Sequence, residues 1–155
     1  MDLLVKLYAL PAEKAGEPVA APEYEVRRAF AAEKGLVRRW IAQHFGDRWA
    51  SESEAAFARL PISCFVAVVD DQIAGFACYD ATTRGFFGPV GVSEEQRQRG
   101  IGRALLLATL RDMANQGYAY AIIGAAGSAG FYTRELGAIE IPDSVPGFYR
   151  GMLRA

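Results

Sequence analysis

The stretch from Val90 to Leu105 constrains this chain more than any other part of its sequence. An apolar, strand-like run ends there, a polar loop follows, and Gly-x-Gly opens a helical pattern. The first turn of a helix leaves backbone N–H groups without intrahelical partners and carries the positive end of the helix dipole. Arg97, Arg99 and Arg103 add positive charge beside those groups. The segment therefore predicts a binding site for phosphate groups.

Two common phosphate-binding motifs do not fit this stretch. A dinucleotide fingerprint requires a third glycine where Leu105 stands, and an acidic residue about twenty residues further on. Residues 117–123 contain no carboxylate. A P-loop requires Gly-Lys followed by Ser or Thr, which is absent from this loop. A domain that binds ATP or NAD is therefore disfavoured.

Composition excludes further classes of protein. The chain has 155 residues, with 17 Lys and Arg against 18 Asp and Glu, and thus a net charge of −1. General nucleic-acid binders are clearly basic, so that class is disfavoured. No apolar run reaches the roughly 18–20 residues that cross a bilayer, and residues 1–6 lack the features of a signal peptide. We expect a single cytoplasmic domain over residues 1–155.

The cysteines and the histidine give no metal site. Cys64 and Cys78 lie in apolar runs, so we expect two buried, reduced thiols. His44 is the single histidine, and it falls at the end of an amphipathic helical pattern, where a structural role is expected. A zinc site needs three or four His, Cys or carboxylate ligands. The sequence therefore predicts no metal.

Hydrophobic periodicity predicts a mixed α/β domain. Prolines and a glycine indicate a loop over residues 11–22, and Gly35 is expected to divide the helical pattern of residues 23–45 into two short helices. Ser51 and Glu54 form a candidate capping box for a helix that runs to Leu60. Two more helices are expected at residues 101–116 and 128–136. Strands are expected at residues 3–10, 62–69, 73–79, 85–92, 118–123, 138–141 and 149–153.

The glycine loop also matches a third pattern, Arg/Gln-x-x-Gly-x-Gly/Ala, which here reads Arg-Gln-Arg-Gly-Ile-Gly over residues 97–102. This run resembles the acyl-CoA-binding loop of the GNAT superfamily of N-acetyltransferases. Downstream, Phe131-Tyr132 and Leu136-Gly137 stand where that family has an aromatic pair and a helix end. The order of the expected elements along the chain is also similar to the family.

The resemblance implies a fold and a cofactor. The fold would be a central mixed, mostly antiparallel sheet of about six or seven strands, flanked by about four helices. The cofactor would be acetyl-CoA as acetyl donor, with the strand end pairing with its pantetheine arm and the loop holding its pyrophosphate. The implied cofactor-binding residues are Val90, Gly91, Val92, Arg97, Gln98, Arg99, Gly100, Ile101, Gly102 and Arg103.

The resemblance also implies a reaction, in which the amine of an acceptor attacks the acetyl thioester directly. Tyr132 is the candidate general acid for the departing thiolate. The general base stays open, because residues 85–92 and 118–123 carry no carboxylate, and Ala125 stands where many members have Asn. Asp80 and Glu94 lie nearby in sequence but are expected as solvated turn residues. A water chain, or an amine that arrives neutral, is equally open.

The resemblance leaves the acceptor undetermined. The first two helices and the last loop would frame it, which points to Phe30, Trp40, Tyr79, Phe86 and residues 144–149. A small-molecule amine and a peptide or protein amine both fit, and no nucleic-acid or membrane partner is expected. The chain is expected to be a monomer or a homodimer. The missing strand carboxylate also supports an alternative, a catalytically silent acyl-CoA-binding or regulatory module.

Overall fold

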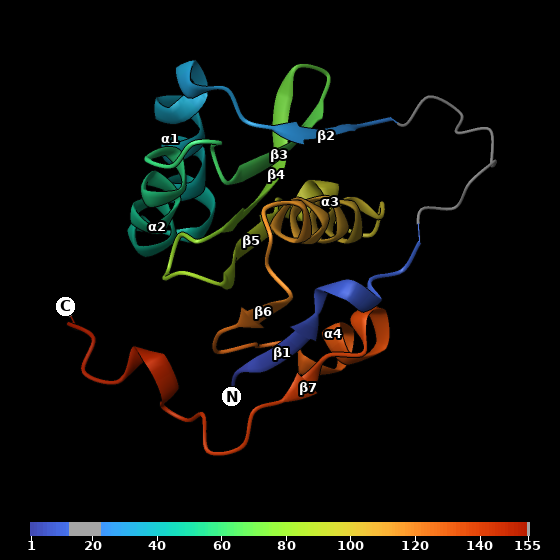
Figure 1. Ribbon diagram of the computed structural model, residues 1–155. Helices are drawn as coiled ribbons and strands as arrows, with labels where there is room; N and C mark the ends of the chain where they lie inside the picture. Colours follow the sequence, from blue (N-terminus) through green and yellow to red (C-terminus); the bar gives the residue numbers. More distant parts are fainter. Residues whose placement is uncertain (13–22, 155) are drawn as a thin grey trace.

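The computed structural model describes residues 1–12 and 23–154, and shows in them a seven-stranded sheet flanked by four α-helices (Figure 1). The strands are β1 (Leu3–Lys6), β2 (Glu25–Arg28), β3 (Cys64–Val69), β4 (Gln72–Tyr79), β5 (Phe86–Val92), β6 (Tyr120–Ile123) and β7 (Ile139–Glu140). The helices are α1 (Lys34–Phe45), α2 (Asp47–Phe57), α3 (Ile101–Asn115) and α4 (Ala129–Leu136). The expected mixed α/β fold is confirmed.

The strands lie in the order β2-β3-β4-β5-β6-β1-β7. Neighbouring strands run antiparallel except β5 and β6, which are parallel. The parallel pairing covers Phe86 with Ile122 and Phe87 with Ile123. The sheet is therefore mixed and mostly antiparallel, as expected, and its single parallel junction is short.

Side chains of the central strands alternate between two hydrophobic cores, one on each face of the sheet. On β3, Phe65 belongs to the core that α3 covers, whereas Val66 belongs to the core that α1 and α2 cover. Leu105 of α3 and Ile41 of α1 are fully buried on their respective sides. Figure 1 shows α1 and α2 on one side of β3, β4 and β5, and α3 on the other. Because both faces of the sheet are packed against hydrophobic cores, the strands hold the loops at their ends in fixed positions.

Residues 25–28 differ from the helical expectation and form strand β2. Val26 pairs with Ala67 of β3 and packs against the core, so the partner that fixes this strand is distant in sequence. The helix begins only after Phe30, whose backbone N–H donates to Glu33 Oε2 at 2.8 Å. The spacing of apolar residues before Phe30 therefore did not indicate a helix.

The break between the first two helices also lies elsewhere than expected. Gly35 sits in the first turn of α1, and the chain breaks at Gly46, whose φ of +94° is a conformation that favours glycine. The helix α2 therefore starts at Asp47, and Ser51 lies inside it and caps nothing. The predicted capping box was wrong, because Gly46 already ends one helix and starts the next.

The two ends of the described chain also correct the expectations. Strand β1 ends at Lys6 and a 3-10 segment, Leu7–Ala9, follows it. Residues 149–153 form no strand, and a 3-10 segment, Gly147–Tyr149, stands at the start of that region. The loop predicted over residues 11–22 lies outside the described residues from position 13 onward.

Two smaller expectations concern the thiols and the membrane. Cys64 and Cys78 are buried free thiols on paired strands, as predicted. Among the described residues, the helices are all too short or too polar to cross a bilayer.

Candidate active site

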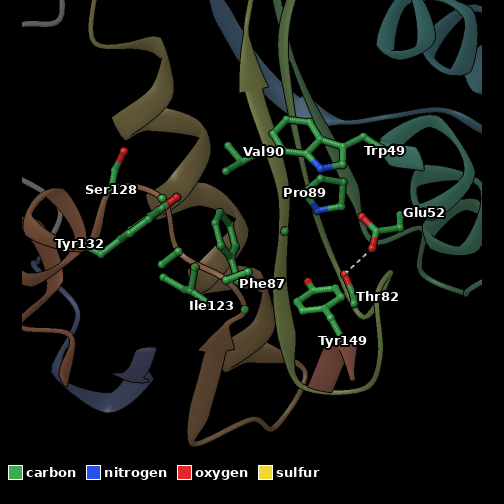
Figure 2. A pocket seen from close by; sticks show the side chains of 15 residues that line it. Trp49, Glu52, Thr82, Phe87, Pro89, Val90, Ile123, Ser128, Tyr132 and Tyr149 are labelled. Carbon is green, nitrogen blue, oxygen red and sulfur yellow. Dashed lines mark hydrogen bonds between the residues drawn. The ribbon is translucent and has the colours of Figure 1, made fainter. Parts of the chain in front are cut away.

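A cavity of about 400 Å³ opens where β5 leaves β6, and we call it the first cavity (Figure 2). Opposite β4, the register of β5 shifts between Ala77 and Tyr79, which leaves Gly88 and Pro89 outside the regular ladder. The backbone there faces the space that the short parallel pairing leaves open. The residues that line this cavity are Trp49, Glu52, Thr82, Phe87, Gly88, Pro89, Val90, Ile123, Gly124, Ala125, Ala126, Gly127, Ser128, Tyr132 and Tyr149.

The predicted phosphate loop starts helix α3 with open backbone donors. Gly100 (φ +81°) and Gln98 (φ +65°) have left-handed backbones that turn the chain into the helix. The first helical bond runs from Ala104 N to Gly100 O at 3.0 Å, so the N–H groups of Ile101, Gly102 and Arg103 come before it. A Cβ added at Gly102 would meet only Val92 Cγ2, at 3.7 Å. The loop therefore fits a diphosphate approaching the backbone.

The three arginines of the loop contact oxygens of the chain itself. Arg97 Nε donates to Val92 O at 3.2 Å, and Arg99 pairs with Glu23. Arg103 Nε donates to Glu135 Oε2 at 2.8 Å and thereby joins α3 to α4. Exposed ion pairs of this kind contribute about 1 kcal/mol or less. These side chains can therefore exchange their present oxygen partners for the phosphates of a ligand.

The predicted cofactor residues divide into cavity wall and core. Val90 lines the first cavity, while Ile101 is 1% exposed and packs in the core, so its backbone alone can face a ligand. Gly91 faces α1, since an added Cβ would lie 2.5 Å from Phe45 Cζ. Val92 packs against the α3 core. The structure thus gives most of these residues a backbone or packing role and leaves the arginines as the charged side chains.

Tyr132 lines the first cavity from helix α4. Burial raises the pKa of its phenol, which keeps the hydroxyl protonated at neutral pH. Figure 2 shows Tyr132 and Ser128 on one side of the cavity, with Glu52, Thr82 and Tyr149 on the other. A proton donor therefore faces the cavity at the place that the motif predicts.

Glu52 is the carboxylate that the sequence analysis missed. It reaches the first cavity from α2, is half-buried, and its Oε1 accepts a hydrogen bond of 3.1 Å from Thr82 Oγ1. Burial raises the pKa of the Glu52 carboxyl, and the Thr82 hydrogen bond and the charge of Arg48 oppose that rise. A carboxylate with a raised pKa suits proton acceptance near neutral pH. No local sequence pattern marks Glu52, because its hydrogen-bond partner Thr82 lies on another element.

Asp80 and Glu94 take no part in the cavity wall. Asp80 is buried rather than solvated, and it accepts hydrogen bonds from Gly85 N and Tyr118 Oη, each at 2.6 Å. It therefore holds the turn between β4 and β5. Glu94 is exposed, as expected, and its Oε1 lies 3.9 Å from Arg97 Nη1.

A second cavity of about 400 Å³ adjoins the first and shares Trp49, Glu52, Gly124, Ala125 and Tyr149 with it. Its other lining residues are Met1, Asp2, Arg48, Ser144, Val145, Pro146 and Met152. Glu52 stands at the junction of the two spaces. The Glu52 carboxylate therefore faces both cavities.

The predicted acceptor residues are brought together only in part. The loop of residues 144–149 lines the second cavity, and Phe148 packs on Phe86 with ring centroids 5.2 Å apart. Phe30 is 62% exposed and lines neither cavity. Trp40 packs in the core of α1 and α2, and Tyr79 Oη donates to Asp112 Oδ2 at 2.7 Å. These last three residues therefore have surface or structural roles.

Two further sequence predictions concern the role of His44 and the absence of a metal site. The ring of His44 stacks on Trp40 at 4.3 Å between centroids, which is a structural contact as expected. In the part of the chain that the structure describes, no three His, Cys, Asp or Glu side chains gather in a way that could hold a metal ion.

Solved structures of acetyltransferases share this fold. A GCN5-related N-acetyltransferase from Sphaerobacter thermophilus is 21% identical, with a TM-score of 0.67, and the match covers 89% of this chain and 47% of that one. A GNAT family acetyltransferase from Brucella melitensis in complex with acetyl-CoA is 20% identical, with a TM-score of 0.58, over 72% of this chain and 80% of that one. Likeness at this level of identity shows the fold.

A third structure shows that the fold also occurs within longer proteins. The glucosamine N-acetyltransferase region of a fungal multi-domain beta-N-acetylglucosaminidase is 16% identical, with a TM-score of 0.66, over 87% of this chain. This chain spans 19% of that fungal protein and less than half of the Sphaerobacter one. No curated protein matches the chain. The model of the acetyltransferase (GNAT) family matches residues 23–138, which is most of the sequence, and the chain therefore belongs to the GNAT family of acetyltransferases.

Proposed function

We propose that this chain transfers an acetyl group from acetyl-CoA to a primary amine by direct attack, with Glu52 as general base and Tyr132 as general acid. The observation that carries the proposal is a single cavity with a carboxylate on one wall and a phenol on the other, beside the gap between β5 and β6 (Figure 2). The residue set also fits the donor, because the start of α3 offers N–H groups and three arginines to its phosphates.

Acetyl-CoA would supply an activated thioester, and the remaining work falls to this chain. Glu52 takes a proton from the ammonium of the acceptor, so that the nitrogen lone pair forms a bond to the carbonyl carbon. The C–S bond then breaks, Tyr132 gives its proton to the sulfur, and the second proton that the nitrogen loses restores the Tyr132 phenol. The backbone at Gly88, outside the regular ladder, orients the carbonyl oxygen. Holding the amine and thioester together provides a large further part of the rate gain.

The proposal is tested by measuring acetyl-CoA binding by calorimetry together with thiol release over a panel of primary amines. Binding accompanied by thiol release on at least one amine supports the transferase. Binding without thiol release on any amine would support the alternative, a silent acyl-CoA-binding module, whose original support was the missing strand carboxylate. The carboxylate of Glu52, which reaches the cavity from helix α2, supports the transferase instead. Absence of acetyl-CoA binding would overturn both readings.

The proposal also covers the domain extent, cellular location, oligomeric state and partners of the chain. We propose one domain over residues 1–155, acting in the cytoplasm as a monomer or homodimer, on a small-molecule amine or a peptide or protein amine, and without nucleic-acid or membrane partners. The near-neutral charge supports the last point. Light scattering of the chromatographed protein measures the oligomeric state, and a mass above that of a dimer would overturn this part.

A further inference from the structure

Three charged side chains line the second cavity: Asp2, Arg48 and Glu52. Their hydrogen bonds indicate different roles for them. Asp2 is buried, its Oδ1 accepts the N–H of Ala125 at 2.9 Å, and its own N–H donates to Ser144 Oγ at 2.8 Å. Asp2 therefore orders the two loops that form this wall. The Ala125 hydrogen bond fixes Asp2 Oδ1 at this wall, whereas Arg48 and Glu52 reach the cavity from helix α2.

Arg48 and Glu52 lie one turn apart on α2, so their side chains share a face of the helix. Among the described residues, no carboxylate forms an ion pair with Arg48 and no group donates a hydrogen bond to Glu52 Oε2. Arg48 is close enough for its charge to act on Glu52. Helix α2 thus presents one cation and one anion to the cavity, about one helical turn apart, and both can form further hydrogen bonds.

Most of the other side chains in the wall are apolar. Trp49 lies between Arg48 and Glu52 in sequence, and Val145, Pro146 and Met152 also line the cavity, beside the polar Ser144 and Tyr149. A volume of about 400 Å³ is at the small end of ligand pockets. A matching molecule is small, has a cation and an anion close together, and buries an apolar body.

We propose that the acceptor in this cavity is a free amino acid with an apolar side chain, an inference that rests on the proposed function. The ammonium faces Glu52, the carboxylate pairs with Arg48, and the side chain packs among Trp49, Val145 and Met152. A polyamine would place a second cation beside Arg48, where it is repelled. The transfer forms the N–C bond of an N-acetyl amino acid, breaks the C–S bond, and leaves the carboxylate unchanged.

The test compares acceptors that differ only in the carboxylate, L-phenylalanine against phenethylamine and L-leucine against isoamylamine, by thiol release at saturating acetyl-CoA. A charge-assisted pair with Arg48 predicts a kcat/KM about tenfold or more higher for the amino acid. In R48Q that preference disappears, because KM for the amino acid rises toward the KM of the matching amine. R39Q is the matched control, because Arg39 is an exposed arginine on α1 that lines neither cavity.

The proposal is overturned if the amines are equal to or better than the amino acids, or if R48Q keeps the preference. If acetyl-CoA binds but no acceptor releases thiol, the proposed function fails separately. The cavity is then tested by calorimetry of L-phenylalanine and phenethylamine with the CoA-bound protein. Tighter binding of the amino acid, lost in R48Q, supports the inference, and equal or absent binding rejects it.

Discussion

Thr82 Oγ1 donates a hydrogen bond of 3.1 Å to Glu52 Oε1 and so joins the turn between β4 and β5 to helix α2. The contact holds the carboxylate at the junction of the two cavities while its second oxygen stays open to a ligand. Burial and this hydrogen bond act on the pKa of Glu52 in opposite directions. The Thr82 hydrogen bond thus positions the carboxylate, while burial of Glu52 raises its pKa and so makes it a stronger base.

Replacing Glu52 by Gln keeps the size of the side chain and removes the proton acceptor. We expect kcat with an amine to fall by about 10²–10⁴-fold, the usual contribution of a general base, while acetyl-CoA affinity is kept. Steady-state kinetics and calorimetry measure the two effects. E54Q is the control, since Glu54 lies on the same helix, pairs with Arg38 at 3.3 Å and lines neither cavity. A kcat near the wild-type value in E52Q would remove Glu52 from the mechanism.

Replacing Thr82 by Val removes the hydrogen bond that lowers the pKa of Glu52. The pKa then rises further, and because the base must be ionised, the acidic limb of the kcat/KM profile moves to higher pH. A hydrogen bond of ordinary strength predicts a shift of about half to one pH unit. T83V is the matched control in the same turn. A shift to lower pH, or none, would contradict the assignment.

Glu52 also costs stability, since burial disfavours its charged form. Its pKa in the folded protein exceeds the value in the unfolded chain, so folding is most favourable below the unfolded pKa, about 4.3, and is weakened as the pH rises through the folded pKa. We expect E52Q to have a higher Tm than the wild type by a few degrees at neutral pH. Calorimetric scans should show the gap widening from acidic pH upward, and a gap that narrows would refute the argument.

Replacing Tyr132 by Phe removes the hydroxyl and keeps the packing of the ring. We expect kcat to fall about a hundredfold with little change in acetyl-CoA affinity, because protonation of the leaving sulfur is lost. Y120F serves as control, since Tyr120 is an exposed tyrosine on β6. Unaltered turnover in Y132F would show that Tyr132 only packs against the cavity.

The glycine turn at the start of α3 and the helix that carries Tyr132 could be predicted because their signals are local. A strand end, a glycine turn and a helix start follow one another within residues 90–103, and each is legible from neighbouring residues. Glu52 could not be found that way, because its partner Thr82 is thirty residues distant and on another element. The run of residues 51–54 instead suggested a helix cap. Strand β2 was missed for the same reason, since its ladder partner β3 comes almost forty residues later.

Placing Asp at Gly102 tests the phosphate site itself. The carboxylate would stand in the first turn of α3, facing the phosphates, and we expect acetyl-CoA affinity to fall about tenfold or more through like-charge repulsion. G102A is the control, because its Cβ meets only Val92 Cγ2 at an ordinary 3.7 Å. An acidic residue is favourable at a helix N-terminus, so the Tm of G102D should not fall. Weaker binding at unchanged Tm therefore reports on the phosphates alone, and full affinity in G102D would place the cofactor elsewhere.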